Sequence, residues 1–104
     1  MYCYDIEDQI IDRVDREAKN RPQTTLIDIT KNRAEEDART IVKYGRTVSM
    51  IAEIRHRDLK NYDANPDSSF YGKGSELWPI YCETLARVIT ELSPTRRISQ
   101  LPTW

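Results

Sequence analysis

Apolar residues recur every three or four positions in the first twenty residues of the chain, which predicts an amphipathic helix over residues 6–19. Asp5 can cap this helix at its start, and Asn20-Arg21-Pro22 ends it. Its apolar face is formed by Ile6, Ile10, Ile11, Val14 and Ala18. Its opposite face is acidic and is formed by Asp5, Asp8, Asp12 and Asp15.

The next stretch, "TTLIDIT" at residues 24–30, is compatible with two structures. Its β-branched residues favour a short strand at 24–29, whereas Thr24 followed by Asp28 could equally open a helix. From Thr30 to Tyr44 the pattern predicts a helix, with an apolar face formed by Ala34, Ala38 and Ile41. Gly45 is suited to end that helix as its C-terminal cap.

Two further helices are predicted, over residues 47–62 and 76–92. The apolar side of the first is formed by Val48, Ile51, Leu59 and Tyr62. The second has the longest apolar stripe in the chain, formed by Trp78, Tyr81, Leu85, Val88, Ile89 and Leu92. Between them, residues 63–75 are rich in Asn, Pro, Ser and Gly, which predicts a loop.

These elements predict an all-α protein, a compact bundle of about four helices, with a short strand at 24–29 as the alternative. The 104 residues suffice for one domain with a modest core. We expect a single helical domain over residues 1–93 and an extended tail over residues 94–104. The tail carries three apolar residues, Ile98, Leu101 and Trp104. They could dock on the domain or on a partner, and we expect them to dock on the domain.

Composition and charge narrow the class of protein. About 32% of the residues are charged and the net charge is −1, so the chain lacks the basic domain typical of a nucleic-acid binder and suits a protein partner with patches of both signs. Cys3 and Cys82 lie far apart and form no secreted disulfide framework. No apolar run is long enough for a signal peptide or a membrane span, so we expect a cytoplasmic protein.

The stretch "HRDLKN" at residues 56–61 shares letters with the catalytic loop of protein kinases. In that loop an asparagine follows the aspartate by five positions, but here that position is Asp63. In a helix over residues 47–62, His56, Arg57 and Asp58 would point in three directions. The chain is also too short for a kinase and lacks its glycine-rich loop. We therefore interpret the match as chance.

Other catalytic and ligand-binding patterns are equally weak. One histidine and two distant cysteines give no metal-ligand set, and "YGKGS" lacks the spacing of a phosphate-binding loop. We expect no enzymatic activity, no metal and no cofactor. The function that we expect is regulation or inhibition by binding a larger protein, as in immunity proteins, antitoxins, adaptors or phage and mobile-element inhibitors, and a homodimer is a further alternative.

Two surfaces are candidates for binding a protein partner. Aromatic side chains commonly anchor interfaces, so the loop residues Phe70 and Tyr71, with Lys73 on the polar rim, form the first candidate. The alternative is that both rings fold back to cover the end of the last helix. The acidic face of the first predicted helix forms the second, although its pairing with basic residues one turn away also suits a solvated surface.

A helix-turn-helix regulator that binds DNA through residues 30–62 is the alternative function. In that arrangement the helix after Gly45 would contact phosphates through four residues: Arg46, His56, Arg57 and Lys60. Ile41, four positions before the glycine, argues against it, because tight helix crossing at that point favours a small residue.

Overall fold

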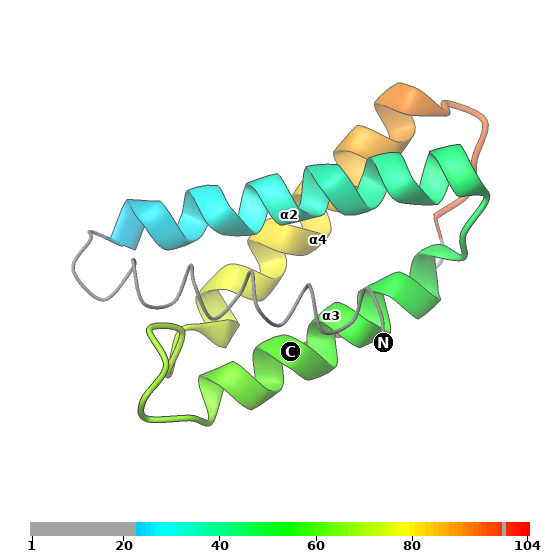
Figure 1. Ribbon diagram of the computed structural model, residues 1–104. Helices are drawn as coiled ribbons and strands as arrows, with labels where there is room; N and C mark the ends of the chain where they lie inside the picture. The colour runs from blue at the N-terminus through cyan, green and yellow to red at the C-terminus, as the bar shows by residue number, and fades with distance from the viewer. Residues whose placement is uncertain (1–22, 99) are drawn as a thin grey trace.

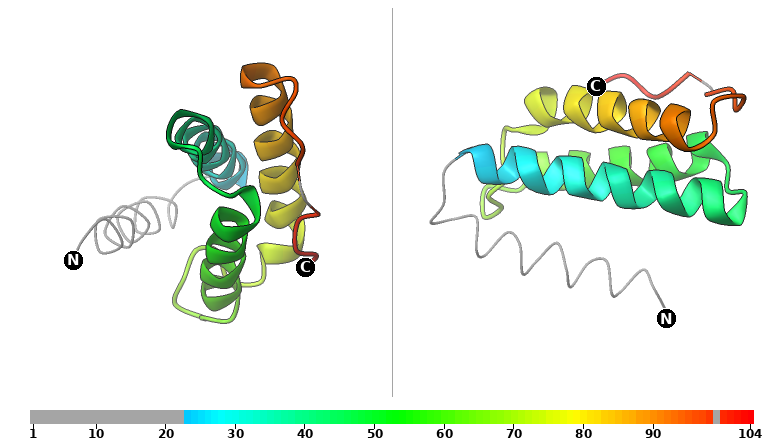
Figure 2. Two further views of the ribbon diagram at one scale, coloured as in Figure 1. Left: turned by 90° about the vertical axis from the view of Figure 1, so that its right-hand side faces the viewer. Right: turned by 90° about the horizontal axis from the view of Figure 1, so that it is seen from above.

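The computed structural model describes residues 23–98 and 100–104. They form three α-helices: α2 (Gln23–Tyr44), α3 (Val48–Asp63) and α4 (Gly74–Leu92). α2 and α3 diverge from the short turn at residues 45–47, and α4 crosses both on the same side (Figures 1 and 2). α4 is thus the common packing partner, and most helix-to-helix contacts join it to α2.

The predicted all-α class is confirmed, whereas two details of the prediction differ from the structure. The described residues hold three helices rather than four, and the predicted helix over residues 6–19 lies outside them. The alternative of a strand at 24–29 is wrong, because α2 already begins at Gln23. Leu26 and Thr30 are buried one turn apart, and the Thr30 hydroxyl donates to the Leu26 carbonyl at 2.8 Å. The burial of residues spaced one helical turn apart therefore outweighs the β-propensity of the β-branched residues in this segment.

The core lies where α2 and α3 pack onto α4. On α2, Ala34, Ala38 and Ile41 have no exposed surface, as the apolar face predicted from the sequence requires. Because two of these are alanines, the large side chains of α4 can pack close to the α2 backbone. The α4 members of this cluster are Trp78, Tyr81, Leu85, Val88 and Ile89. A second, smaller cluster joins Leu26, Phe70 and Leu77.

The connection between α3 and α4 is held by its own hydrogen bonds. The Asn65 side chain accepts from the Asp67 N–H at 3.0 Å, and the Ser68 hydroxyl accepts from the Phe70 N–H at 3.0 Å. The Asp63 carboxylate accepts from the Gly74 N–H at 2.8 Å, which stabilises the start of α4. This ordered connection turns the Phe70 ring into the smaller cluster.

The tail folds back onto α3 and α4, so its docking is intramolecular. Ile98, Leu101 and Trp104 pack against the main core cluster. The Trp78 indole N–H donates to the Pro102 carbonyl at 2.7 Å. Gly74 is needed at its position because a Cβ there would overlap the Trp104 ring.

Candidate binding pocket

A buried ion pair joins α2 to α3, and α4 adds a third member. Arg55 donates through Nε and a terminal nitrogen to the two Asp37 carboxylate oxygens, at 2.8 and 3.0 Å. The Tyr81 hydroxyl donates to the same carboxylate at 2.7 Å. Both charged side chains are less than a tenth exposed. We call Asp37, Arg55 and Tyr81 the buried triad.

The triad links all three described helices through one carboxylate. Burial, reinforced by the negative charge of Asp37, raises the pKa of Tyr81 well above its ordinary value. The phenol therefore keeps its proton and remains a donor to Asp37. The two-pronged contact with Arg55 occupies both oxygens of that carboxylate.

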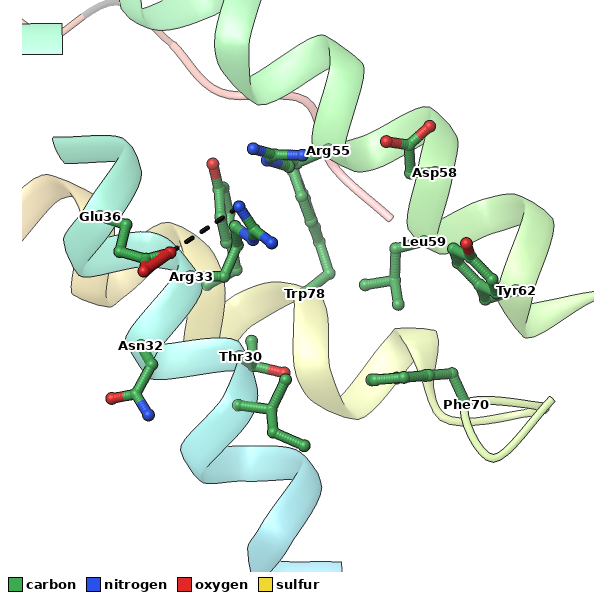
Figure 3. A pocket seen from close by; sticks show the side chains of 12 residues that line it. Thr30, Asn32, Arg33, Glu36, Arg55, Asp58, Leu59, Tyr62, Phe70 and Trp78 are labelled. Atoms are coloured by element: carbon green, nitrogen blue, oxygen red, sulfur yellow. Dashed lines mark ion pairs between the residues drawn. The ribbon is translucent and has the colours of Figure 1, made fainter. Parts of the chain in front are cut away.

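Beside the triad, a pocket of about 250 Å³ opens between α2 and α3. We call it the α2–α3 pocket. Figure 3 shows its apolar lining, with Leu59 and Tyr62 on α3, Phe70 on the following connection and Trp78 on α4. Arg55 and Tyr81 of the triad also line it. The fold therefore places four aromatic side chains around one opening.

The polar edge of the pocket comes mainly from α2. Thr30, Asn32, Arg33 and Glu36 lie along this edge, and Asp58 of α3 lies across from them (Figure 3). Arg33 and Glu36 form an ion pair at 3.8 Å, with the Arg33 side chain only 19% exposed. The pocket is thus an apolar cavity with charges of both signs at its margin.

The two aromatic residues of the loop predicted as an interface differ in their burial. Phe70 is 6% exposed and forms part of the pocket lining and of the smaller core cluster. Tyr71, by contrast, is 52% exposed. Lys73 is half-buried at the start of α4. The acidic residues Asp5, Asp8, Asp12 and Asp15 lie outside the described residues.

The four residues of the helix-turn-helix alternative do not share one open face. The tail lies over His56, whose Nε2 is 2.9 Å from the Thr103 main-chain oxygen. It also lies over Lys60, whose ammonium is 4.2 Å from the centre of the Trp104 ring. Arg46 and Arg57 are exposed. Two of the four side chains that would contact phosphates therefore contact the tail instead.

The residues of the kinase-like stretch are separated in space, as a helix requires. His56 lies edge-on to Trp78 and Trp104, with ring centres 4.9 and 5.5 Å apart. Arg57 faces solvent, and Asp58 is buried at the margin of the pocket. In the part of the chain that the structure describes, no group of three His, Cys, Asp or Glu side chains could hold a metal ion.

Sequence reasoning missed the buried triad, although the sequence carries a signal for it. Asp37 interrupts the apolar face of α2 next to Ala38, and Arg55 interrupts that of α3 between Ala52 and Leu59. Two opposite charges on the facing apolar stripes of neighbouring helices are costly unless they pair. That pattern could have predicted both the ion pair and the contact between α2 and α3.

Two further findings bear on the class of protein. None of the helices at residues 23–98 is long and apolar enough to cross a membrane. Comparison with protein-family models, with curated proteins and with solved structures finds no match to this chain.

Proposed function

We propose that this protein is a small regulatory or inhibitory protein of the cytoplasm that acts by binding a larger protein. The observation that supports this function best is the α2–α3 pocket, with its aromatic lining and charged margin. In this proposal the pocket receives an apolar side chain of the partner, and the protein carries out no chemistry of its own.

The size of the pocket favours a side chain over a cofactor. Pockets for drug-sized ligands and cofactors usually measure roughly 300–1,000 Å³. At about 250 Å³ the α2–α3 pocket is smaller, and it suits one or two apolar side chains. Interfaces are commonly anchored in this way, with an aromatic or aliphatic residue of one protein filling a desolvated pocket of the other.

The rim of the pocket supplies the polar part of such an interface. Glu36 is exposed next to Arg33, and Asn32 is exposed one turn before Glu36. A partner with charges of both signs around an apolar anchor would complement this rim, as we expected from the mixed charge pattern of the sequence. Tyr71 could extend the contact because it is exposed on the same loop as the pocket residue Phe70.

The test is to block the pocket from its rim. Asn32→Trp adds a bulky ring at an exposed position of the lining, and Thr40→Trp is the matched control at an exposed α2 position outside the lining. Partners captured from the native host by the wild-type protein are identified by mass spectrometry, and their affinity is then measured with purified proteins. We expect Asn32→Trp to weaken binding at least tenfold and Thr40→Trp to leave it unchanged.

Equal affinity of both variants for the partner would contradict the proposed binding site. The DNA-binding alternative is tested in parallel by a mobility-shift assay with duplex DNA. We expect only weak binding that disappears near physiological salt, because few phosphate contacts would be made. A shift at sub-micromolar protein in that salt, abolished by Arg57→Ala with Lys60→Ala, would replace the protein-binding function with DNA binding.

A further inference from the structure

We infer that one end of the molecule is a second binding surface, which receives an acidic segment of a protein partner. The surface lies where α2 ends, α3 begins and the tail leaves α4, and these segments lie together in both Figure 1 and Figure 2. The inference rests on the proposed function only in that the partner is a protein, and it does not depend on the α2–α3 pocket. We call this surface the basic end, and it consists of Lys43, Tyr44, Arg46, Met50, Arg96 and Arg97.

Hydrogen bonds hold the two parts of the basic end together, although they lie far apart in the sequence. The Arg96 guanidinium donates to the Arg46 carbonyl, and the Arg96 N–H donates to the Ser93 carbonyl at 3.0 Å, so the chain turns directly after α4. The Arg46 N–H donates to the Ile41 carbonyl at 3.0 Å, across the turn between α2 and α3. The main chain therefore fixes both arginines, while the Arg46 side chain remains exposed.

The basic end has no acidic residues to neutralise it. Residues 38–52 and 92–104, which supply it, carry five basic residues and no acidic one, whereas the rest of the chain carries 17 acidic and 11 basic residues. Among the described residues, no ion pair joins a carboxylate to a cation of the basic end. Lys43 complements the dipole of α2 at its last turn, but the arginines lie outside that helix. Like charges held together in this way attract an anionic group.

Two large apolar side chains flank the same turn. Tyr44 is 63% exposed and Met50 is 62% exposed, and they are the most exposed large apolar side chains of the described residues. The Lys43 ammonium lies 5.3 Å from the centre of the Tyr44 ring, so charge and aromatic surface are presented side by side. Tyrosine offers a large contact area with few rotamers to freeze, and methionine adapts to different contact shapes. A segment in which carboxylates alternate with apolar side chains fits this surface.

The small extent of the basic end favours an acidic protein segment over a nucleic acid or a membrane. Duplex DNA carries one negative charge for about every 1.7 Å of its length, and an anionic membrane is charged over its whole surface. Either would extend beyond the basic end to the rest of the molecule, whose excess of acidic residues would repel it. An acidic segment can confine its carboxylates to the basic end, where the planar guanidinium groups of arginine can bind them in pairs of hydrogen bonds.

Binding of a labelled acidic peptide to the full-length protein tests the inference. The probe is a synthetic peptide of glutamate and aspartate with one leucine and one phenylalanine, and its binding is followed by fluorescence anisotropy at about 50 mM salt. We expect Arg46→Gln with Arg97→Gln to weaken binding about tenfold, because two exposed cations of the surface are lost. Lys31→Gln with Arg87→Gln is the matched control, since it removes the same charge from exposed positions elsewhere, and it should change the affinity less than about twofold.

Several outcomes would overturn the inference. The two double variants could lose affinity equally, or a peptide with glutamine and asparagine in place of the acids could bind as tightly as the acidic one. Tighter binding of the wild-type protein to vesicles of phosphatidylserine and phosphatidylcholine, or to duplex DNA, than to the acidic peptide would overturn it in favour of that partner.

The pocket variant separates this inference from the proposed binding site. Asn32→Trp should bind the acidic peptide as tightly as the wild-type protein, because Asn32 lines the pocket and not the basic end. For the partner captured from the native host, we expect Arg46→Gln with Arg97→Gln to weaken binding as well. If only Asn32→Trp weakens it, the basic end is overturned and the pocket stands. If only the arginine variant weakens it, the basic end stands and the pocket fails.

Discussion

Removing one side of the buried ion pair should destabilise the protein strongly. In Asp37→Ala, Arg55 loses the carboxylate that accepts its bonds at 2.8 and 3.0 Å, and the Tyr81 hydroxyl loses its acceptor at 2.7 Å. Because both charged side chains are less than a tenth exposed, water compensates poorly for the lost group. Breaking such a pair typically costs about 3–5 kcal/mol. Small domains have a total stability of about 5–15 kcal/mol.

Urea denaturation followed by circular dichroism measures this loss. With a denaturant slope of about 2 kcal/mol per molar urea, the unfolding midpoint should fall by roughly 2 M. Glu91→Ala is the matched control, because it removes the exposed pair between Arg87 and Glu91 at 3.3 Å. That exposed pair contributes only about 0.3–0.5 kcal/mol, which is close to the error of the method.

A double variant tests the reason for the loss. Asp37→Leu with Arg55→Met replaces the pair by apolar side chains of similar size, so no buried charge remains without its partner. We expect this variant to be much more stable than Asp37→Ala, as with other buried pairs replaced in this way. The reasoning is refuted if Asp37→Ala loses no more stability than Glu91→Ala, or if the double variant is as unstable as the single one.

Three further predictions concern the loop, the tail and the thiol. Tyr71→Ala should weaken partner binding by about 1–3 kcal/mol; a sharp fall in melting temperature with no separate loss of affinity would assign the ring to the core. Gly74→Ala should displace Trp104 and shift the tryptophan emission to longer wavelength, and an unchanged spectrum would refute the predicted overlap. Burial raises the pKa of Cys82 to about 11. In a Cys3→Ser protein at pH 8, the Cys82 thiol should therefore be alkylated about a hundredfold more slowly in the folded state than in the urea-unfolded state. Because the folded pKa is the higher one, the stability that this thiol contributes is lost as pH rises from about 9 to 11.

The sequence predicted the helices well because apolar residues recur along each of them with the three-to-four-residue period of an α-helix. The faces containing Ala34 and Leu85 were located correctly, and Gly45, with a φ of 63°, ends α2 as its lack of a side chain suggests. The start of α2 was left open, because residues 24–29 could form a strand or open a helix, and α2 in fact begins at Gln23. β-branched residues there favour a strand locally, and only contact of Leu26 with the smaller core cluster decides for the helix.

The candidate site was predicted less well, because it depends on how the helices are placed relative to one another. The partner-binding role expected for Phe70 stays a prediction; the sequence could not show that the hydrogen bonds of its loop turn the ring into the pocket lining. Arg55 was missed because its charge on the apolar face of α3 was not compared with that of Asp37 on the apolar face of α2, and only the two together indicate a buried pair. Local pattern therefore gives each helix and its buried side, whereas the pocket arises from the divergence of α2 and α3.

The position of α4 as the common partner of α2 and α3 has a consequence for synthesis on the ribosome. A nascent chain that has emerged only as far as Asp63 contains both α2 and α3 but still lacks the α4 side chains that pack with Ala34, Ala38 and Ile41 in the main core cluster. The Tyr81 hydroxyl that completes the triad is also still missing. The described fold can therefore form cooperatively only after α4 has left the exit tunnel, and the growing chain must stay soluble until then through its abundant surface charges.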